Sequence, residues 1–169
     1  LSILGDRQKF AFGQYVVASR FPLRDCGRRD IPFRQRVHTY VTCVVTAHGT
    51  DFDLVTVHLI SPRSGLAAVR ADPLDAIGEW KENIADRMTQ AEKLARDLRS
   101  HQRPVIVAGD LNAPGTSLVV RRLTETGLRD AFAAAGSGYG HTWGHSLRFR
   151  FSFLRIDHIL VAPEFAVAT

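Results

Sequence analysis

The spacing of apolar residues changes near residue 75, and this change limits the fold to one that combines strands with a long helix. From Asp75 to Ser100, apolar side chains recur at helical spacing and charged residues fill the opposite face. Pro73 precedes this segment and Pro104 follows it, as expected for a helix bounded by prolines. Val105–Ala108 comes next and is apolar at every position, which indicates a short buried strand. The expected apolar face of the helix consists of Ile77, Trp80, Ile84, Met88, Ala91, Leu94, Ala95 and Leu98.

Strand patterns dominate the chain before this helix. Gln14–Ser19 is short and β-branched and predicts a strand, which Pro22 and the polar stretch 24–30 are expected to end. Gln35–Ala47 and Asp51–Leu59 are β-rich and flank a short turn, a pattern typical of a hairpin. Both runs become apolar on both faces towards their ends, so we expect the sheet to be covered on each side.

The remaining residues predict one more helix and a late strand. Ser117–Thr126 is expected to be helical, with Ser117 as the N-terminal cap and Gly127 as the stop. Residues 136–144 are glycine-rich and indicate a loop, and Phe149–Val161 alternates in part, as a strand or strand pair would. Strand, hairpin, helix, buried strand, helix and strand together predict an α/β fold with helices packed on a sheet.

Length and charge narrow the classes of protein. A chain of 169 residues is long enough for one domain with a sizeable core and too short for two ordinary ones, so we expect a single domain over residues 1–169. No apolar run is long enough for a transmembrane helix, although a first residue other than Met leaves an upstream leader or anchor open. The formal net charge of +5 favours an anionic partner, such as nucleic acid, a phosphorylated small molecule or a phospholipid head group. A basic but unspecific surface is the alternative.

Cys26 and Cys43 do not form a pair with the spacing of a thiolate zinc site. Two unpaired buried thiols are the simpler interpretation, because a disulfide cannot be argued from their spacing. One disulfide is the alternative.

His58 is the first candidate for chemistry. It ends an apolar strand in Val57-His58-Leu59, just before the break at Ser61-Pro62. Side chains at strand ends face the rim of a sheet, where ligands bind. For a single histidine, a structural role is the alternative.

Asp110 and Asn112 follow the buried strand in the segment 109–114. A carboxylate directly after such a strand is costly unless it is paired or coordinated. In an extended segment these two side chains would share a face, and together they would suit a carboxylate that orients water or metal and an amide that binds a phosphate oxygen. A turn-capping role for Asp110 is the alternative. A calcium loop is excluded, because Pro114 occupies a ligand position and Arg121 replaces the bidentate Glu.

Asp157 and His158 interrupt a late apolar strand. Neighbours on a regular strand face opposite sides, so only one of the two can enter a given pocket. The chain contains no phosphate-binding loop, nucleophile elbow, zinc-protease or dinucleotide motif.

Together and in this order, the three motifs resemble the endonuclease/exonuclease/phosphatase (DNase I-like) superfamily. The resemblance covers nearly the whole chain, and Gly109-Asp110-Leu111-Asn112 is its most specific part. Residues 58–63, with Ser61-Pro62-Arg63, are similar to a bacterial branch of the family. The segments that carry the likeness are Ala18–Leu23, Val57–Leu59, Ala108–Asn112, Leu128–Phe132 with Thr142-Trp143, and Arg155–Ile159.

The resemblance implies a fold and a reaction. The fold is a four-layer α/β/β/α sandwich, and the reaction is hydrolysis of phosphodiesters or phosphomonoesters with Mg²⁺ or Mn²⁺. Carried over, His58 binds or protonates a phosphate oxygen and Asp110 orients or deprotonates the attacking water. Asn112 stabilises the phosphoryl transition state, and Asp157 is the carboxylate that pairs with a C-terminal histidine.

The resemblance leaves the substrate open between nucleic acid, lipid and small phosphate esters. Arg63 and Trp143 are expected to contact it, and Arg150 is a further basic residue near the site. A cation and hydrogen-bond donors are needed because phosphate esters repel nucleophiles.

Two motifs of the family have no counterpart between Leu1 and Thr169. They are the N-terminal strands with an Asn and a Gln-Glu, whose Glu is the main metal ligand, and the final Ser-Asp-His strand. We therefore expect a chain truncated at both ends, in which Asp110 is only a weak metal ligand. Such a chain is expected to bind Mg²⁺ poorly and to be slow or inactive by itself. The rival hypothesis is a degenerate, non-catalytic relative that binds a phosphorylated partner.

Overall fold

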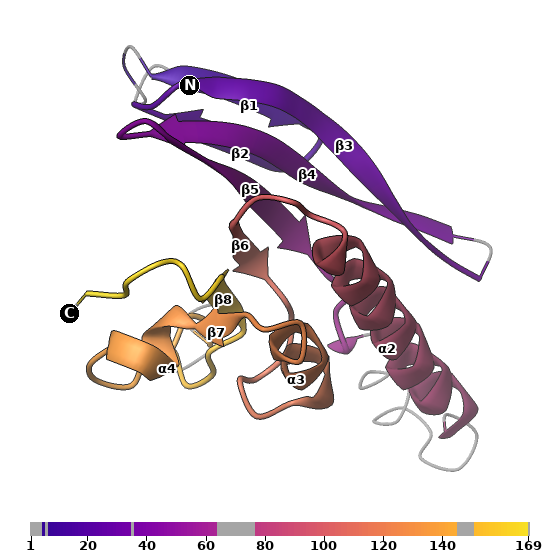
Figure 1. Cartoon of the computed structure of the whole chain (residues 1–169). Coiled ribbons are helices and arrows are strands. Elements are labelled where there is room, and N and C mark those ends of the chain that lie inside the picture. Colours follow the sequence, from indigo (N-terminus) through magenta and orange to yellow (C-terminus); the bar gives the residue numbers. More distant parts are fainter. Residues whose placement is uncertain (1–4, 6, 35, 64–76, 145–150, 169) are drawn as a thin grey trace.

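A six-stranded sheet forms the centre of the molecule in the computed structural model, which describes residues 5, 7–34, 36–63, 77–144 and 151–168 (Figure 1). The strand order is β3-β4-β5-β6-β8-β7. These strands are β3 (Leu23–Phe33), β4 (Arg36–Ala47), β5 (Thr50–His58), β6 (Val105–Asp110), β7 (Arg129–Asp130) and β8 (Asp157–Val161). The predicted α/β class is confirmed.

The two faces of the sheet are covered differently. Helices α2 (Ile77–Arg99) and α3 (Leu118–Thr124) belong to the larger core on one face, with Val55, Val57 and Leu94 among its buried residues. A two-stranded sheet of β1 (Gln8–Phe12) and β2 (Tyr15–Ser19) packs on the other face over β3 to β5. The short helix α4 (Ala131–Ala135) follows β7. The expected covering of both faces of the hairpin is confirmed, since Tyr40 to Val45 are all buried.

The pairing of β5 with β6 sets up the site. These two strands are parallel and the segment between them includes α2, whereas all other pairs in the sheet are antiparallel. The carboxyl ends of β5 and β6 therefore lie at the same edge, with His58 opposite Asp110. The backbones approach closely there, because a Cβ built on Gly109 would lie 2.0 Å from the Val57 carbonyl oxygen.

The predicted hairpin and second helix are confirmed. β4 and β5 pair antiparallel from Tyr40–Val57 to Ala47–Thr50. The Ser117 hydroxyl caps α3 by accepting the Val120 N–H at 3.3 Å.

Two predicted boundaries are wrong. The predicted strand Gln14–Ser19 does end at Ser19, but the stretch 24–30, which was expected to lie outside any strand, belongs to β3. It was misread because β3 is an edge strand whose polar side chains face solvent. In the expected late strand, only Asp157–Val161 is a strand among the described residues, and residues 151–156 contribute a single bridge from Leu154 to Trp143. Residues 149–150, like residues 75–76 of the expected helix, lie outside the described part.

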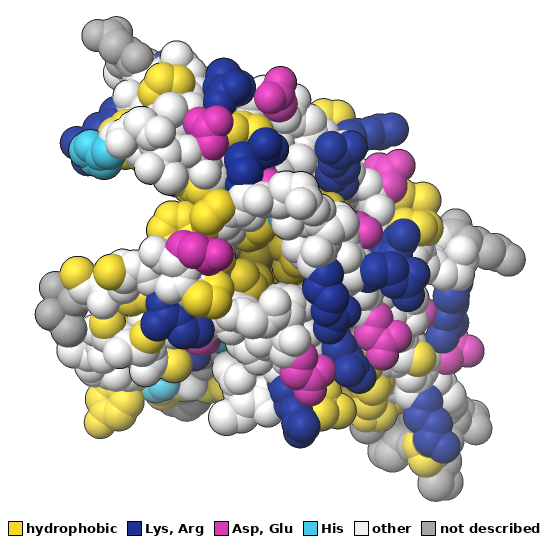
Figure 2. Space-filling view, viewed as in Figure 1, with side chains coloured by type: hydrophobic (Ala, Val, Ile, Leu, Met, Phe, Trp, Pro, Cys, Tyr) yellow, Lys and Arg dark blue, Asp and Glu magenta, His cyan; other side chains and the backbone are white. Residues whose placement is uncertain are grey.

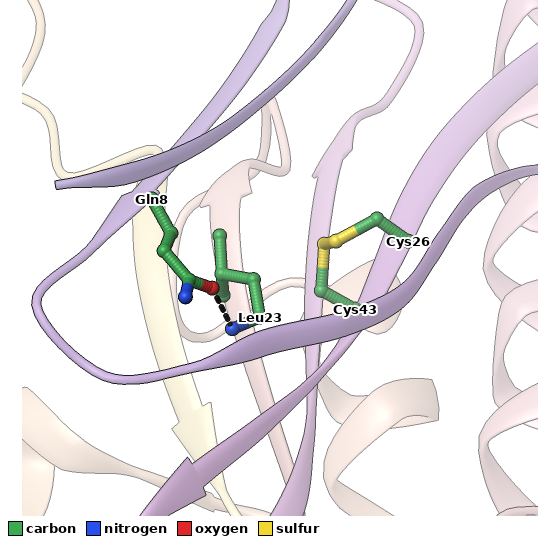
Figure 3. The surroundings of a disulfide bond; sticks show 4 residues. All are labelled: Gln8, Leu23, Cys26 and Cys43. Carbon is green, nitrogen blue, oxygen red and sulfur yellow. Dashed lines mark hydrogen bonds between the residues drawn. A yellow bond between two sulfur atoms is a disulfide. The ribbon is translucent and has the colours of Figure 1, made fainter.

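The cysteines are joined, which corrects the expectation of two unpaired thiols (Figure 3). Cys26 lies on β3 and Cys43 on β4, where the register shifts between Arg24 and Gly27. This irregularity brings Cys26 beside Cys43. The pairing could not be expected from the sequence, because the polar residues around Cys26 did not predict a strand. Next to the disulfide, the Leu23 N–H donates to the side-chain oxygen of Gln8 and ties β1 to β3.

The buried face of α2 differs from the predicted one in its N-terminal half. Ala91, Leu94, Ala95 and Leu98 are buried as expected, but Ile77 and Ile84 are 47% and 41% exposed. Asn83 in that half and Gln90 just past the middle of the helix are buried instead. The helix therefore presents polar side chains where it passes the strand ends.

Basic residues on the face shown in Figure 2 alternate with acidic ones and do not form one patch. On the face shown in Figure 2, Lys and Arg side chains lie over α2 and α3 interspersed with Asp and Glu. Arg34 pairs with Glu82 at 2.9 Å and Asp86 at 2.7 Å, and Arg122 pairs with Glu125 at 3.0 Å. In the part of the chain that the structure describes, no helix could cross a membrane.

Candidate functional site

Three polar side chains form a row across adjacent strands. His58 at the end of β5 is paired with Asp110 at the end of β6, and Asp110 is paired in turn with Asp157 at the start of β8. Residues paired across strands project from the same face of a sheet. Neighbouring positions 55 and 57 on β5 point into the helix-covered core, so the row lies on the opposite face, beside β2.

His58 is oriented by residues of the first hairpin. Its Nδ1 lies 2.9 Å from the Gln14 side-chain oxygen, and its backbone N–H donates to the Tyr15 hydroxyl at 3.3 Å. That hydroxyl donates to the Thr39 carbonyl at 2.6 Å, which fixes it in turn. With Nδ1–H donating to Gln14, Nε2 points towards Asp110 at 3.7 Å from Oδ2. The side chain of His58 remains 43% exposed and can be reached by a ligand.

Asp110 uses its two oxygens differently. Oδ1 accepts the Asn112 N–H at 2.7 Å, which caps the turn, and Oδ2 faces His58. Burial raises the pKa of the Asp110 carboxyl, and the nearby charge of Asp157 adds to this rise. The Asn112 N–H, His58 and Arg63 oppose the rise without cancelling it. Asp110 is therefore a stronger base than an ordinary aspartate.

Asn112 does not continue an extended strand, which corrects the geometry assumed from sequence. Its φ of 50° is left-handed, a conformation that asparagine tolerates better than most residues. Nδ2 donates to the Leu59 carbonyl at 2.8 Å, and its own carbonyl accepts from Arg87 Nη2 at 2.7 Å. The side chain thus bridges the loops that follow β5 and β6.

Asp157 and His158 point to opposite sides of β8. Asp157 is exposed and stands next to Asp110. His158 is 3% exposed, with Nδ1 3.0 Å from Asp130 Oδ2, and its Nε2–H donates to the Ala113 carbonyl at 2.8 Å. Burial alone would raise the pKa of Asp130, but hydrogen bonds from His158 and Arg155 outweigh it and lower that pKa. His158 thus holds the Asp110–Ala113 loop from the face of β8 opposite to Asp157.

Arg63 and Trp143 lie together beside the row. The Arg63 guanidinium lies 5.4 Å from the centre of the Trp143 ring, close enough for a cation–π contact. The positive charge of Arg63 is near enough to Asp110 to oppose slightly the rise in the pKa of that carboxyl. Trp143 follows Thr142, whose hydroxyl accepts the Asp157 N–H at 3.2 Å. Arg150 lies outside the described residues.

Sequence reasoning missed three residues that support the site. Gln14 and Tyr15 orient His58, and Arg87 holds the Asn112 carbonyl. For Arg87 a signal existed, since a charged residue on the inward face of a helix needs a polar partner. No sequence pattern connected Gln14 and Tyr15 to His58.

The fit of a divalent cation rests on two carboxylates. The described residues contain no group of three or more His, Cys, Asp or Glu placed to hold a metal ion. Asp110 and Asp157 are adjacent, and their mutual repulsion contributes to the raised pKa of Asp110. A cation relieves such repulsion, and Mg²⁺ accepts one or two carboxylates with several waters. Asp110 and Asp157 are therefore the carboxylates at the row that could hold such an ion, and the ion would need further oxygen ligands.

The sequence from residue 7 to residue 169 matches the model of the endonuclease/exonuclease/phosphatase family. No curated protein matches the chain.

Solved structures of similar fold include proteins of bacteria and of a nematode. A family protein from Leptotrichia buccalis is 16% identical with a TM-score of 0.61, and the match covers 88% of this chain and 53% of that one. Truncated TDP2 of Caenorhabditis elegans is 19% identical with a TM-score of 0.60, covering 87% and 55%. The mannosyl-6-phosphatase Bt3783 of Bacteroides thetaiotaomicron is 19% identical with a TM-score of 0.57, covering 85% and 54%. The chain thus spans about half the length of each, and these likenesses concern the fold.

Proposed function

The chain belongs to the endonuclease/exonuclease/phosphatase family, and from this premise we propose that it contributes a phosphate-ester hydrolysis site at the row His58, Asp110 and Asp157. The observation that carries the proposal is the pairing of Asp110 with a reachable histidine on one side and a second carboxylate on the other. Hydrolysis of a phosphate ester requires a base for water, donors for the phosphate oxygens and a means to neutralise charge.

Asp110 is the proposed base. The proton of the attacking water passes to Oδ2 as the new P–O bond forms, and the bond to the leaving oxygen breaks. The raised pKa of Asp110 brings its basicity closer to neutral pH, where proton transfer is most effective. Oδ1 remains bound to the Asn112 N–H, which keeps the carboxylate in one orientation.

His58 is the proposed donor to a phosphate oxygen. Because Nδ1–H is directed to Gln14, the neutral ring presents a lone pair at Nε2, and only the protonated ring presents an N–H there. The working state then combines a protonated His58 with an ionised Asp110.

Asn112 and Asp157 complete the proposed set. Asn112 Nδ2 has a second hydrogen besides the one given to Leu59, and we assign it to a phosphoryl oxygen in the transition state. Asp157 is exposed, and we propose that its carboxylate adds to the negative charge beside Asp110 that would attract a cation.

Mg²⁺ or Mn²⁺ is the proposed cofactor. In this chain Asp157 would supply one ligand and Asp110 only a weak one, since Oδ1 of Asp110 is bonded to the Asn112 N–H and Oδ2 is the proposed proton acceptor. When bound, such an ion neutralises charge on the phosphate. Arg63 and Trp143 are proposed to contact the substrate, since a guanidinium and an indole suit a phosphate and an apolar or aromatic group.

The proposal is tested by phosphate release and strand cleavage assays with Mg²⁺ on the whole gene product. The substrates are a generic phosphodiester, plasmid DNA, a phosphorylated sugar and a phospholipid. Asp110→Asn is expected to reduce turnover at least about 100-fold, the usual contribution of a general base. Glu164→Gln, at an exposed carboxylate outside the site, is the matched control and should leave turnover unchanged. Binding of a phosphorylated ligand without turnover of any substrate would favour the non-catalytic alternative.

A further inference from the structure

A stripe of polar side chains on α2 faces the loops that carry the proposed site. Asn83, Arg87 and Gln90 occupy positions spaced by four and three residues, so they lie on one side of the helix. The same side continues as Leu94 and Leu98, which are buried in the core. This side of the helix is therefore apolar in its C-terminal part, which packs on the sheet, and polar towards its N-terminus, which lies near the carboxyl ends of the strands.

Each member of this polar stripe bonds to main-chain groups of a site loop. The Gln90 side-chain oxygen accepts the Ile60 N–H at 2.9 Å, and Asn83 Nδ2 donates to the Ser61 carbonyl at 3.1 Å. Both contacts hold the loop after His58. Arg87 Nη2 donates to the Asn112 carbonyl at 2.7 Å and holds the loop after Asp110.

Arg87 differs from Asn83 and Gln90 because its side chain is charged. Among the described ion pairs, none includes Arg87, and burial lowers the pKa of its guanidinium. Its Nε is buried without a hydrogen-bond partner in the described structure. Burying a cation without a paired anion costs free energy. The hydrogen bond from Arg87 to the loop is therefore a candidate for a functional role and not only a stabilising one.

We infer that Arg87 is a positioning residue that holds the left-handed turn at Asn112. This turn directs the Asn112 N–H to Asp110 Oδ1 and leaves Oδ2 to face His58. Among the described contacts, the hydrogen bond of Arg87 goes to the Asn112 carbonyl and not to Asp110 or His58, so Arg87 is inferred to act through this carbonyl. Its catalytic consequence rests on the proposed function, whereas its effect on the turn does not.

The effect on the turn is measured by amide hydrogen exchange in the chain itself. Arg87→Gln should speed exchange of the Asn112 N–H at least about tenfold, because the turn opens locally, while Val107 in the centre of β6 stays unchanged. Arg87→Lys retains one donor and should give an intermediate rate. Arg96→Gln, at an exposed position of the same helix, is the control and should change neither amide.

Two results would overturn the inference. Unchanged exchange at Asn112 in Arg87→Gln would mean that the turn does not depend on Arg87. Equal acceleration at Asn112 and Val107 would mean that Arg87 only stabilises the whole fold. If Arg87→Gln does not fold, the same comparison is made with Arg87→Lys.

The catalytic consequence is measured separately on the whole gene product. Arg87→Gln should lower kcat on the order of 100-fold with little change in KM, since misplaced catalytic groups reduce the rate more than binding. If Arg87→Gln speeds Asn112 exchange but leaves kcat unchanged, Arg87 holds the turn without affecting the reaction, and its catalytic consequence is contradicted. Absence of turnover in every form would contradict the proposed function while leaving the exchange result in force.

Discussion

At the scale of single residues, Asp110 combines a structural and a chemical task. One oxygen caps the turn at Asn112, which confirms the turn-capping interpretation, and the other faces His58 and is left for the proposed chemistry. The cost is a half-buried carboxylate beside a second one, expressed in its raised pKa. Sites that accept such a cost are typical of function rather than of stability.

The raised pKa of Asp110 predicts the acidic limb of the rate profile. Ionised Asp110 is the reactive form, so kcat/KM should fall as pH decreases through a value above the ordinary aspartate pKa of 3.8. Asp157→Asn removes the like charge and should move this limb to lower pH. The measurement is kcat/KM against pH for both proteins, and a limb that does not move would contradict the coupling between the two carboxylates.

The same shift predicts a stability effect with a definite sign. The pKa of Asp110 is higher in the folded than in the unfolded state, so between these two pKa values the folded state holds a proton that the unfolded state releases. The free energy of unfolding therefore falls as the pH rises through this range. At neutral pH, Asp110→Asn should therefore raise Tm by a few degrees at most, while removing activity. Thermal unfolding at pH 7 checks this, and a clear fall in Tm would show that the carboxylate stabilises the fold.

Residue types and order in the sequence indicated four candidates, and the structure places them close together. They are His58, Asp110, Asn112 and Asp157. Their support could not be identified in the same way. Gln14 and Tyr15 reach His58 from a hairpin more than forty residues earlier, by contacts that exist only after the sheets pack. Arg87 stood on the expected helix, but an apolar stripe was followed through positions 77 and 84, which are exposed.

At the scale of elements, the parallel pair β5 and β6 is the most sensitive part of the site. Gly109 allows the two backbones to approach one residue before Asp110. A helix, a buried strand and a hairpin were all readable from their periods, because each repeats one local pattern. Strand β3 was not, since an edge strand with polar, exposed residues resembles a loop.

Gly109→Ala should destabilise the fold strongly. The added Cβ would lie 2.0 Å from the Val57 carbonyl oxygen, which forces β5 and β6 apart. We expect a loss of several kcal/mol, in the range of disruptive substitutions. Gly78→Ala is the control, because nothing lies within 4 Å of its Cβ and the site is helical, where alanine is preferred. Urea unfolding of both variants checks this, and equal midpoints would contradict the close approach.

At the scale of the whole molecule, family and fold agree although identities are at most 19% in the structures compared above. The family was recognisable from short motifs at strand ends, because these motifs carry the chemistry. The packing of β1 and β2 on the other face of the sheet could not be predicted, because the sequence of a hairpin does not show which surface it packs against. The match covers about half of each compared structure, so activity belongs to measurements on the whole gene product.

The central claim is that the row of His58, Asp110 and Asp157 is the cation and phosphate site, and paramagnetic broadening by Mn²⁺ tests it most directly. In ¹H–¹⁵N spectra of the chain, substoichiometric Mn²⁺ should first broaden the amides of these three residues, and excess Mg²⁺ should restore them. Asp110→Asn should weaken the effect. Broadening that begins instead around the carboxylates of a separate pocket would contradict the claim; these are Asp25, Asp30, Asp53 and Asp97.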